Sequence, residues 1–283
     1  MLSSSDDVVT APSPLHARII GAGPPVLFVH GLGASGRYWG SGFDALADSH
    51  RLAFVDLSGF GRSRSVPGPY GIDGQVRHLR RFVDEKLPAP PLVLVGHSFG
   101  AVVAFAAAAR WTGVSAVVAF GLPAFTSPEE GRRHLVALGL MNRWMATASP
   151  WARRACWTLC RFRPVARAVA PFMAPDLPPE VARDGVEHTW ASARQAFDSL
   201  VHDADLVHWA GAASASLVVV QGDGDLIAPP ESLARVLGDT RMKIRTMSGD
   251  HHLPLRQPDR CLEISRSSSD PAEPARPAAV SSG

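Results

Sequence analysis

A serine between two glycines stands out among the residues that could do chemistry. It lies in the pentapeptide 96–100, Gly-His-Ser-Phe-Gly, directly after the apolar run 91–95 and before the alanine-rich run 101–109. This arrangement is typical of a strand, a sharp turn and a helix, with the Ser98 hydroxyl presented at the turn. A side chain at either glycine position would collide with the neighbouring strand or helix. We therefore predict that Ser98 is a nucleophile.

A serine nucleophile needs a base, and the base needs a carboxylate that orients it. Two loops that follow apolar runs offer these groups. The loop after the run 216–221 carries Asp223 and Asp225, and a later loop carries His251 and His252. Either aspartate could be the acid and either histidine the base, although an aspartate in a Gly-rich turn can also serve only to stabilise that turn.

Attack on a carbonyl creates an oxyanion, which backbone N–H groups must stabilise. Phe99 follows the serine at the start of the predicted helix, so its amide faces the reacting group. The segment 30–33, His-Gly-Leu-Gly, follows another apolar run, and its glycines allow a close approach to a substrate. We predict that the amides of Leu32 and Phe99 form an oxyanion hole.

Short apolar runs bounded by turn residues predict the strands that position these groups. These runs cover residues 15–20, 26–30, 52–56, 92–95, 114–120, 216–221 and 242–247. Most are apolar throughout, which is typical of parallel strands covered by helices on both faces. Patterns of helical period lie at 38–47, 74–87, 98–110 and 229–237. The alternation predicts an α/β fold with a doubly wound, mostly parallel sheet, in which ligands bind at the carboxyl ends of the strands.

One long segment breaks this alternation. Residues 122–207 contain helical patterns and several prolines but no convincing strand, which predicts a helical cap, or lid, inserted over the active edge of the sheet. The core of the fold then comprises residues 1–121 and 208–264. Residues 265–283 are rich in Ser, Pro and Ala, so we expect a disordered tail there.

Large apolar side chains of the predicted cap are candidates for a substrate pocket. We select Trp144, Met145, Trp151 and Phe172, because aromatic and Met side chains suit apolar or aromatic groups. The same class of residue also includes Met141, Trp157, Phe162 and Met173. Any of them could instead pack the cap onto the sheet. We expect a small, largely apolar substrate.

Composition limits the function classes. The formal net charge of +2 is too small to indicate nucleic-acid binding, and no apolar stretch reaches the roughly 20 residues that span a bilayer, so stable membrane insertion is not expected. The first residues lack the features of a signal peptide, and we interpret Cys156 and Cys160 as buried apolar residues of a cytoplasmic protein.

Arginines cluster within 153–167, which indicates a solvated helix face or, alternatively, contact with an anionic substrate or a membrane surface.

Several segments resemble the α/β-hydrolase superfamily, in particular its esterase and haloperoxidase-like branch with a helical cap. Residues 24–33 resemble the oxyanion loop, 56–63 the Asp-x-x-Gly-x-Gly-x-Ser turn and 96–100 the nucleophile elbow. Residues 222–229 and 251–258 resemble the acid and base loops. The likeness is weakest in the predicted cap.

The resemblance ranks Asp225 above Asp223 as the acid and His251 above His252 as the base, and it gives Asp56 a structural role in its own loop. It implies a Ser-His-Asp triad that needs no metal or cofactor and hydrolyses a carboxylic ester, thioester or lactone through an acyl-enzyme. A serine at the elbow argues against haloalkane dehalogenase and epoxide hydrolase activity, for which the family uses aspartate.

The same triad could serve other functions, because a fold does not decide between reactions. The alternatives are C–C bond hydrolysis, acyl transfer, cofactor-free haloperoxidation and low-turnover ligand binding.

The chain also departs from the family in two places. Asp250 precedes the base where the family usually has Gly, and could favour an imidazolium. The closing helix has only 258–264 as a candidate, so one face of the sheet is expected to be poorly covered.

Overall fold

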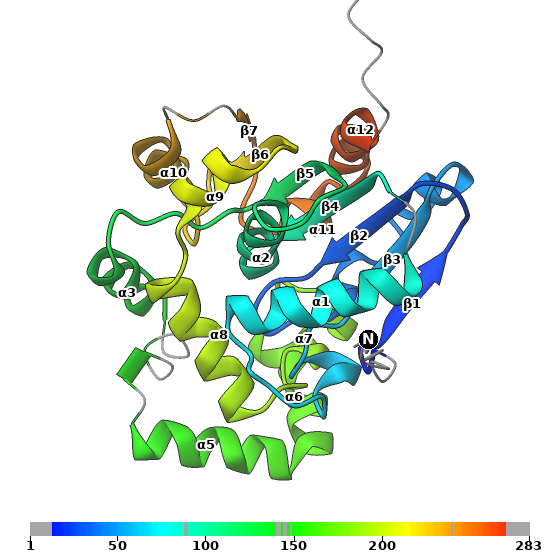
Figure 1. Cartoon of the computed structure of the whole chain (residues 1–283). Coiled ribbons are helices and arrows are strands. Elements are labelled where there is room, and N and C mark those ends of the chain that lie inside the picture. Colours follow the sequence, from blue (N-terminus) through cyan, green and yellow to red (C-terminus); the bar gives the residue numbers. More distant parts are fainter. Residues whose placement is uncertain are drawn as a thin grey trace, which may run out of the picture.

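The computed structural model describes residues 13–87, 90–139, 143, 146–147, 149–238, 240 and 242–269. Within them, one sheet has the strand order β1-β3-β2-β4-β5-β6-β7 (Figure 1). The strands are β1 (Ala17–Ile20), β2 (Pro25–Val29), β3 (Arg51–Val55), β4 (Leu92–His97), β5 (Val114–Phe120), β6 (Ser216–Gly222) and β7 (Lys243–Met247). β1 pairs antiparallel with β3, and all other pairs are parallel. The predicted doubly wound, mostly parallel sheet is confirmed.

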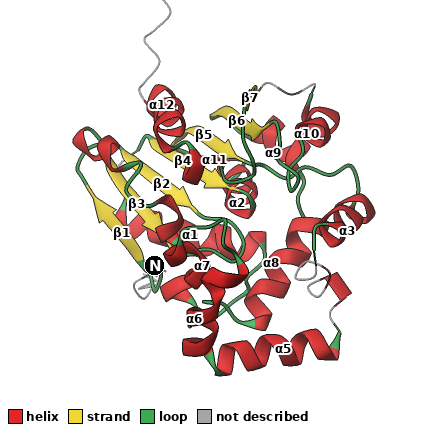
Figure 2. Ribbon diagram, turned by 180° about the vertical axis from the view of Figure 1, so that it is seen from behind, coloured by secondary structure: helices red, strands yellow, loops and turns green. Residues whose placement is uncertain are grey.

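Helices cover both faces of the sheet, which explains why its central strands are apolar throughout (Figures 1 and 2). The helices are α1 (Ile72–Lys86), α2 (Phe99–Ala108), α3 (Pro128–Ala137), α5 (Pro150–Arg161), α6 (Arg163–Met173), α7 (Pro179–Asp184), α8 (Trp190–His202), α9 (Leu206–Ala212), α10 (Pro230–Leu237), α11 (Leu253–Arg256) and α12 (Pro258–Ser269). α1 and α2 pack on one face, and α12 packs on the other. Strands β2 and β4 are buried along their whole length.

The predicted helix at 38–47 is wrong. The structure has two short 3-10 helices there, η1 (Gly36–Trp39) and η2 (Asp44–Asp48). Trp39, Phe43 and Leu46 repeat at a helical spacing and are all buried, which explains the misleading pattern. The chain breaks between η1 and η2 at Gly40, which has φ = 56° and therefore cannot continue a right-handed helix.

The segment between β5 and β6 is helical, as predicted for the cap. Helices α3, α5, α6, α7 and α8 lie below the carboxyl ends of the strands in Figure 1. The expected boundary at 207/208 falls inside α9, and α9 packs on α2 of the core through the buried Trp209. The cap boundary is expected at 207/208 because no strand pattern occurs within 122–207. The absence of a strand does not tell a cap helix from a core helix, such as α9, that leads into β6.

The C-terminal helix corrects two further expectations. α12 packs against the sheet through Cys261 and Ile264, so the face that we expected to be poorly covered is occupied. The helix also continues to Ser269, five residues into the segment expected to be a disordered tail. Its serines fit a helix because the hydroxyls of Ser265 and Ser268 donate to carbonyls four residues earlier, at 2.9 and 2.8 Å. Residues 270–283 lie outside the described part.

Candidate active site

Ser98 lies on the turn between β4 and α2, as predicted. Its backbone has φ = 52° and ψ = −121°, and no other non-glycine residue in the described part of the chain has a positive φ. A Cβ at Gly96 would lie 2.6 Å from the Cα of Ala101, and one at Gly100 would lie 2.3 Å from the carbonyl oxygen of Val29. Both glycines are therefore required for the turn. Backbone strain of this kind costs about 1–3 kcal/mol and is typical of functional sites.

The loop 30–33 lies directly against this serine. A Cβ at Gly31 would lie 3.0 Å from the His97 Nδ1 and 3.1 Å from the Ser98 Cβ, a tight contact that glycine avoids. His30 anchors the loop, because its Nδ1–H donates to the Gly31 carbonyl (2.8 Å) and its Nε2 accepts the Leu57 amide (3.0 Å). Burial lowers the pKa of His30, which keeps the ring neutral and able to accept that second hydrogen bond.

The two predicted oxyanion donors belong to two different segments near the serine. Leu32 belongs to the loop that lines the same cavity as Ser98. Phe99 is the first residue of α2, and the first N–H groups of a helix have no intrahelical acceptor. Their donation to an oxyanion stays a prediction.

The two aspartates of the acid loop have different partners. The Asp225 side chain is buried, and its Oδ2 lies 2.8 Å from the Nδ1 of His251. Its Oδ1 accepts the backbone amides two and three residues further on, both at 2.8 Å. Asp223 is turned toward the following loop, where its Oδ1 accepts the Gly249 amide at 3.0 Å. The structure therefore brings Asp225, rather than Asp223, to His251.

Gln221, at the end of β6, is a positioning residue that sequence reasoning missed. Its Oε1 accepts the Leu122 amide (2.9 Å), and its Nε2 donates to the carbonyls of Leu122 (3.2 Å) and Ala228 (2.8 Å). The side chain is fully buried, so it ties the end of β5 to the acid loop. A polar residue that closes an otherwise apolar strand was the signal that could have identified it.

The two adjacent histidines are also distinguished by their contacts. Both histidines line the cavity that contains Ser98, but His251 bonds to the Asp225 carboxylate. The Nδ1 of His252 instead lies 3.4 Å from the Tyr38 hydroxyl. Burial and the neighbouring His251 lower the pKa of His252 to about 4, so His252 is neutral at pH 7.

His97, within the elbow, packs against His251. Its Nε2–H donates to the carbonyl oxygen of His251 (2.9 Å), and its ring stacks on Tyr38 with 4.4 Å between centroids. Burial lowers the pKa of His97 well below its usual value, and the neighbouring histidines add to this effect. The neutral ring therefore supports the base loop through its N–H donor.

Two acidic residues near the site hold loops through backbone amides. Asp56 accepts the amides of Gly36 and Arg62, each at 2.7 Å, which is the structural role that the resemblance implies for it. Asp250 accepts the His252 amide at 2.9 Å. The geometry of Asp250 supports a role in shaping the base loop.

A cavity of about 270 Å³ contains both Ser98 and His251. Much of its apolar lining comes from the cap and from the acid loop, namely Leu135, Ala174, Leu177, Val181, Ala182, Phe197, Leu200 and Ile227. The predicted pocket residues Trp151 and Phe172 do not line it and are 77% and 83% exposed. Trp144 and Met145 lie outside the described residues. The cap therefore lines the cavity through side chains other than Trp151 and Phe172, and the roles of Trp144 and Met145 stay predictions.

The two cap cysteines lie on one face of α5. Cys156 is buried, Cys160 is half-buried, and their sulfur atoms are 4.0 Å apart as free thiols. In the part of the chain that the structure describes, no cluster of His, Cys, Asp or Glu side chains is arranged to hold a metal ion.

Comparisons with known proteins agree with this geometry. The chain is 39% identical over 116 residues to "Lipase LipV" of Mycobacterium tuberculosis, and 34% identical over 96 residues to "2-hydroxy-6-oxo-2,4-heptadienoate hydrolase" of Pseudomonas putida. These matches cover 37% and 32% of this chain, and 40% and 34% of those proteins. The chain thus spans less than half the length of either relative.

The fold is shared with solved structures. A thermophilic esterase from Thermogutta terrifontis superposes with a TM-score of 0.68 at 21% identity, over 89% of this chain and 92% of that one. The sequence profile of the alpha/beta hydrolase family matches residues 26–264, which include the whole sheet from β2 onward, the cap and the loops described above. The chain therefore belongs to the alpha/beta hydrolase family.

Proposed function

We propose that this protein is a serine hydrolase that cleaves a carboxylic ester, thioester or lactone of a small, largely apolar substrate. The main support is the buried pair of His251 and Asp225, with 2.8 Å between Nδ1 and Oδ2, together with a cavity that both His251 and Ser98 line. Family membership supports a hydrolytic reaction, and a lipase and an esterase are among the similar proteins.

In the proposed mechanism, Ser98 attacks the carbonyl carbon while the Nε2 of His251 takes the hydroxyl proton. Asp225 accepts the Nδ1–H of His251, which keeps Nε2 unprotonated before attack and stabilises the imidazolium afterwards. His251 then gives the proton to the leaving group. A water molecule, deprotonated by the same nitrogen, attacks the acyl-enzyme, and His251 returns that proton to the Ser98 oxygen as the acid leaves.

The amides of Leu32 and Phe99 are proposed to hold the oxyanion that forms at each step. Loss of one such donor typically raises the barrier by about 3–4 kcal/mol. The closeness of the loop 30–33 to Ser98 supports this role, since its glycines leave space for the substrate carbonyl.

The cavity indicates a compact substrate. Its volume of about 270 Å³ lies just below the roughly 300–1,000 Å³ typical of ligand pockets. Leu177, Val181, Phe197 and Leu200 offer apolar surface to an acyl or aryl group, and the polar groups gather around Ser98. We expect short or compact acyl groups to react faster than long chains.

A fluorophosphonate probe tests the nucleophile without knowledge of the substrate. We expect intact mass to show one adduct on the wild-type protein, none on Ser98→Ala, and greatly slowed labelling of His251→Ala. Absence of labelling on folded wild-type protein would contradict the proposal. The control His252→Gln should be labelled at a rate within a few-fold of wild type, because His252 has no role in proton transfer.

A substrate panel then separates the reactions that one triad can perform. Esters and thioesters of increasing acyl length test hydrolysis, and addition of an alcohol acceptor tests whether the acyl group is transferred. A diketone that reacts by C–C cleavage tests for C–C bond hydrolysis. Turnover of the diketone alone would assign a C–C hydrolase instead of an esterase.

A further inference from the structure

Helix α6 has its charged side inward and its apolar side outward. Arg163 and Arg167 face the rest of the protein, whereas Val165, Val169 and Phe172 are exposed to solvent. These three lie at intervals of four and three residues, which places them on one stripe of the helix. A surface helix of a globular protein normally has the opposite arrangement.

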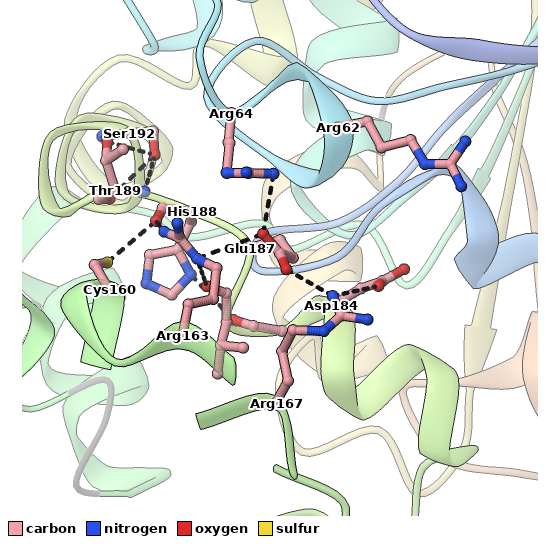
Figure 3. A network of polar contacts seen from close by, with 12 residues as sticks. Arg62, Arg64, Cys160, Arg163, Arg167, Asp184, Glu187, His188, Thr189 and Ser192 are labelled. Atoms are coloured by element: carbon pink, nitrogen blue, oxygen red, sulfur yellow. Dashed lines mark hydrogen bonds and ion pairs between the residues drawn. The ribbon is translucent and has the colours of Figure 1, made fainter. Parts of the chain in front are cut away.

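Ion pairs hold the helix in this orientation (Figure 3). The Nη1 of Arg167 lies 2.6 Å from the Oε1 of Glu187, and the Nε of Arg163 lies 3.4 Å from its Oε2. Arg163 also donates to the carbonyl of His188 at 2.8 Å. Glu187 is buried, so turning α6 to hide its apolar stripe would leave a buried carboxylate without these partners.

Helix α5, which contacts α6, also exposes large apolar side chains. It packs inward through small side chains such as Ala152 and Cys156, while Trp151 and Trp157 are 77% and 65% exposed. α5 forms the outermost edge of the cap in Figures 1 and 2. We call the combined surface the apolar cap face, which consists of Trp151, Trp157, Leu159, Phe162, Val165, Val169, Phe172 and Met173.

The apolar cap face lies in a strongly basic segment. Residues 131–175 contain eight arginines and neither aspartate nor glutamate, although the whole chain carries only +2. Arg153, Arg154 and Arg161 are exposed on α5, and none of them has an ion-pair partner among the described residues. Exposed aromatic residues with unpaired arginines beside them match the combination that binds anionic lipid surfaces.

We propose that the apolar cap face docks on the surface of a lipid bilayer that contains anionic headgroups. Its aromatic and aliphatic side chains would enter the boundary between headgroups and acyl chains, while the three arginines of α5 bind lipid phosphates. α5 and α6 have 12 and 11 residues, and at about 18 Å or less they are too short for the roughly 30 Å hydrocarbon core. No helix among the described residues is both long and apolar enough to span a bilayer. The helices would therefore lie along the surface.

A second copy of the chain is a poorer occupant for this face. In a symmetric dimer, the exposed arginines of one copy would approach those of the other, and neither face offers a carboxylate to compensate. A bilayer with anionic lipids supplies that opposite charge. It would also bring lipid next to the catalytic cavity, because Ala174, immediately after α6, lines that cavity.

Vesicle flotation tests the proposal with the full-length Ser98→Ala protein, so that the result does not depend on the proposed hydrolase activity. We expect binding to phosphatidylcholine vesicles that contain phosphatidylglycerol, weaker binding to phosphatidylcholine alone, and a loss of binding as salt increases. Trp157→Ser with Phe172→Ser should weaken binding at least tenfold. Arg153→Gln with Arg154→Gln should weaken it by about fivefold per arginine.

Matched controls come from exposed residues elsewhere. Val207→Ser and Lys243→Gln remove an exposed aliphatic side chain and an exposed cation outside the apolar cap face, and both should bind vesicles as the parent protein does. All test positions are exposed, so circular dichroism should show folded variants. Equal flotation of every variant would overturn the proposal. So would a dimer in analytical ultracentrifugation that Trp157→Ser with Phe172→Ser dissociates, in a protein that binds no vesicles.

Discussion

Replacing Asp225 with asparagine separates the proposed catalytic role of this residue from its structural role. Its Oδ1 accepts two backbone amides and its Oδ2 faces the Nδ1 of His251. An asparagine would keep its oxygen on the two amides, since only the oxygen can accept them. Its NH₂ group would then donate to Nδ1, and His251 would carry its proton on Nε2, where it cannot take a proton from Ser98.

The size of the effect follows from this change of tautomer. A wrong tautomer in a Ser-His-Asp triad lowers kcat by about 10⁴-fold, which corresponds to about 5.5 kcal/mol of activation free energy. Stability should change by less than about 1 kcal/mol, because every hydrogen bond of the loop keeps a partner. Asp225→Ala would instead leave two backbone amides without an acceptor, at a cost of about 1–3 kcal/mol each.

The assay compares kcat/KM on an activated ester, the fluorophosphonate labelling rate and the thermal midpoint for Asp225→Asn, Asp225→Ala and Asp223→Asn. Asp223 holds only the Gly249 amide, so Asp223→Asn should keep its rate within about tenfold of wild type. The reasoning is refuted if Asp225→Asn retains wild-type activity while Asp223→Asn loses it.

Three further predictions concern pH, turn geometry and the cap. The pKa of His252 is about 4 in the folded state and near 6.5 in the unfolded state. As the pH falls, the unfolded state therefore binds a proton before the folded state does. The free energy of unfolding should fall by up to about 3 kcal/mol from pH 6.5 to pH 4. Urea unfolding of His252→Gln should show a shallower decline. Gly100→Ala should destabilise the fold by at least about 2 kcal/mol because its Cβ meets a carbonyl oxygen. Gly211→Ala, on α9 with open space around it, should stabilise by about 0.5–1 kcal/mol in thermal unfolding. Glu187→Gln should weaken the docking of the cap by about 2 kcal/mol or more, detected as faster proteolysis within residues 150–190 than in the core.

The sheet and the loops of the site were predictable from the sequence because their signals are local. Strands such as β5 are apolar runs that stop at a Gly or Asp, and parallel strands place the residues after them at one edge. Ser98 and Asp225 follow such strands, and His251 follows the more exposed edge strand β7, so the parallel topology brings the three residues to one edge. The choice between Asp223 and Asp225 needed the family resemblance, because both occupy the same turn. Their different hydrogen-bond partners in the structure supply the physical reason.

The cap could not be predicted in the same way, because the side that a helix buries depends on residues far from it in the sequence. Trp151 and Phe172 have the composition of pocket residues, but they are exposed. Phe197 and Leu200 line the cavity from α8, where they look like ordinary core residues. Hydrophobic periodicity identifies a stripe on each helix, yet it cannot say whether that stripe faces a core, a pocket or solvent.

For α6, electrostatics decides which side of the helix faces the rest of the protein. Burying Arg163 and Arg167 would be unfavourable without anionic partners, and Glu187 supplies them from the loop that follows α7. Once these pairs form, Val165 and Phe172 must face outward, where each forgoes about 1.5–3 kcal/mol of the burial free energy that a covering surface would provide. The same ion pairs that orient the cap over the cavity therefore create the apolar cap face. A function for that face gives the most direct reason why the sequence keeps large apolar residues there instead of polar ones.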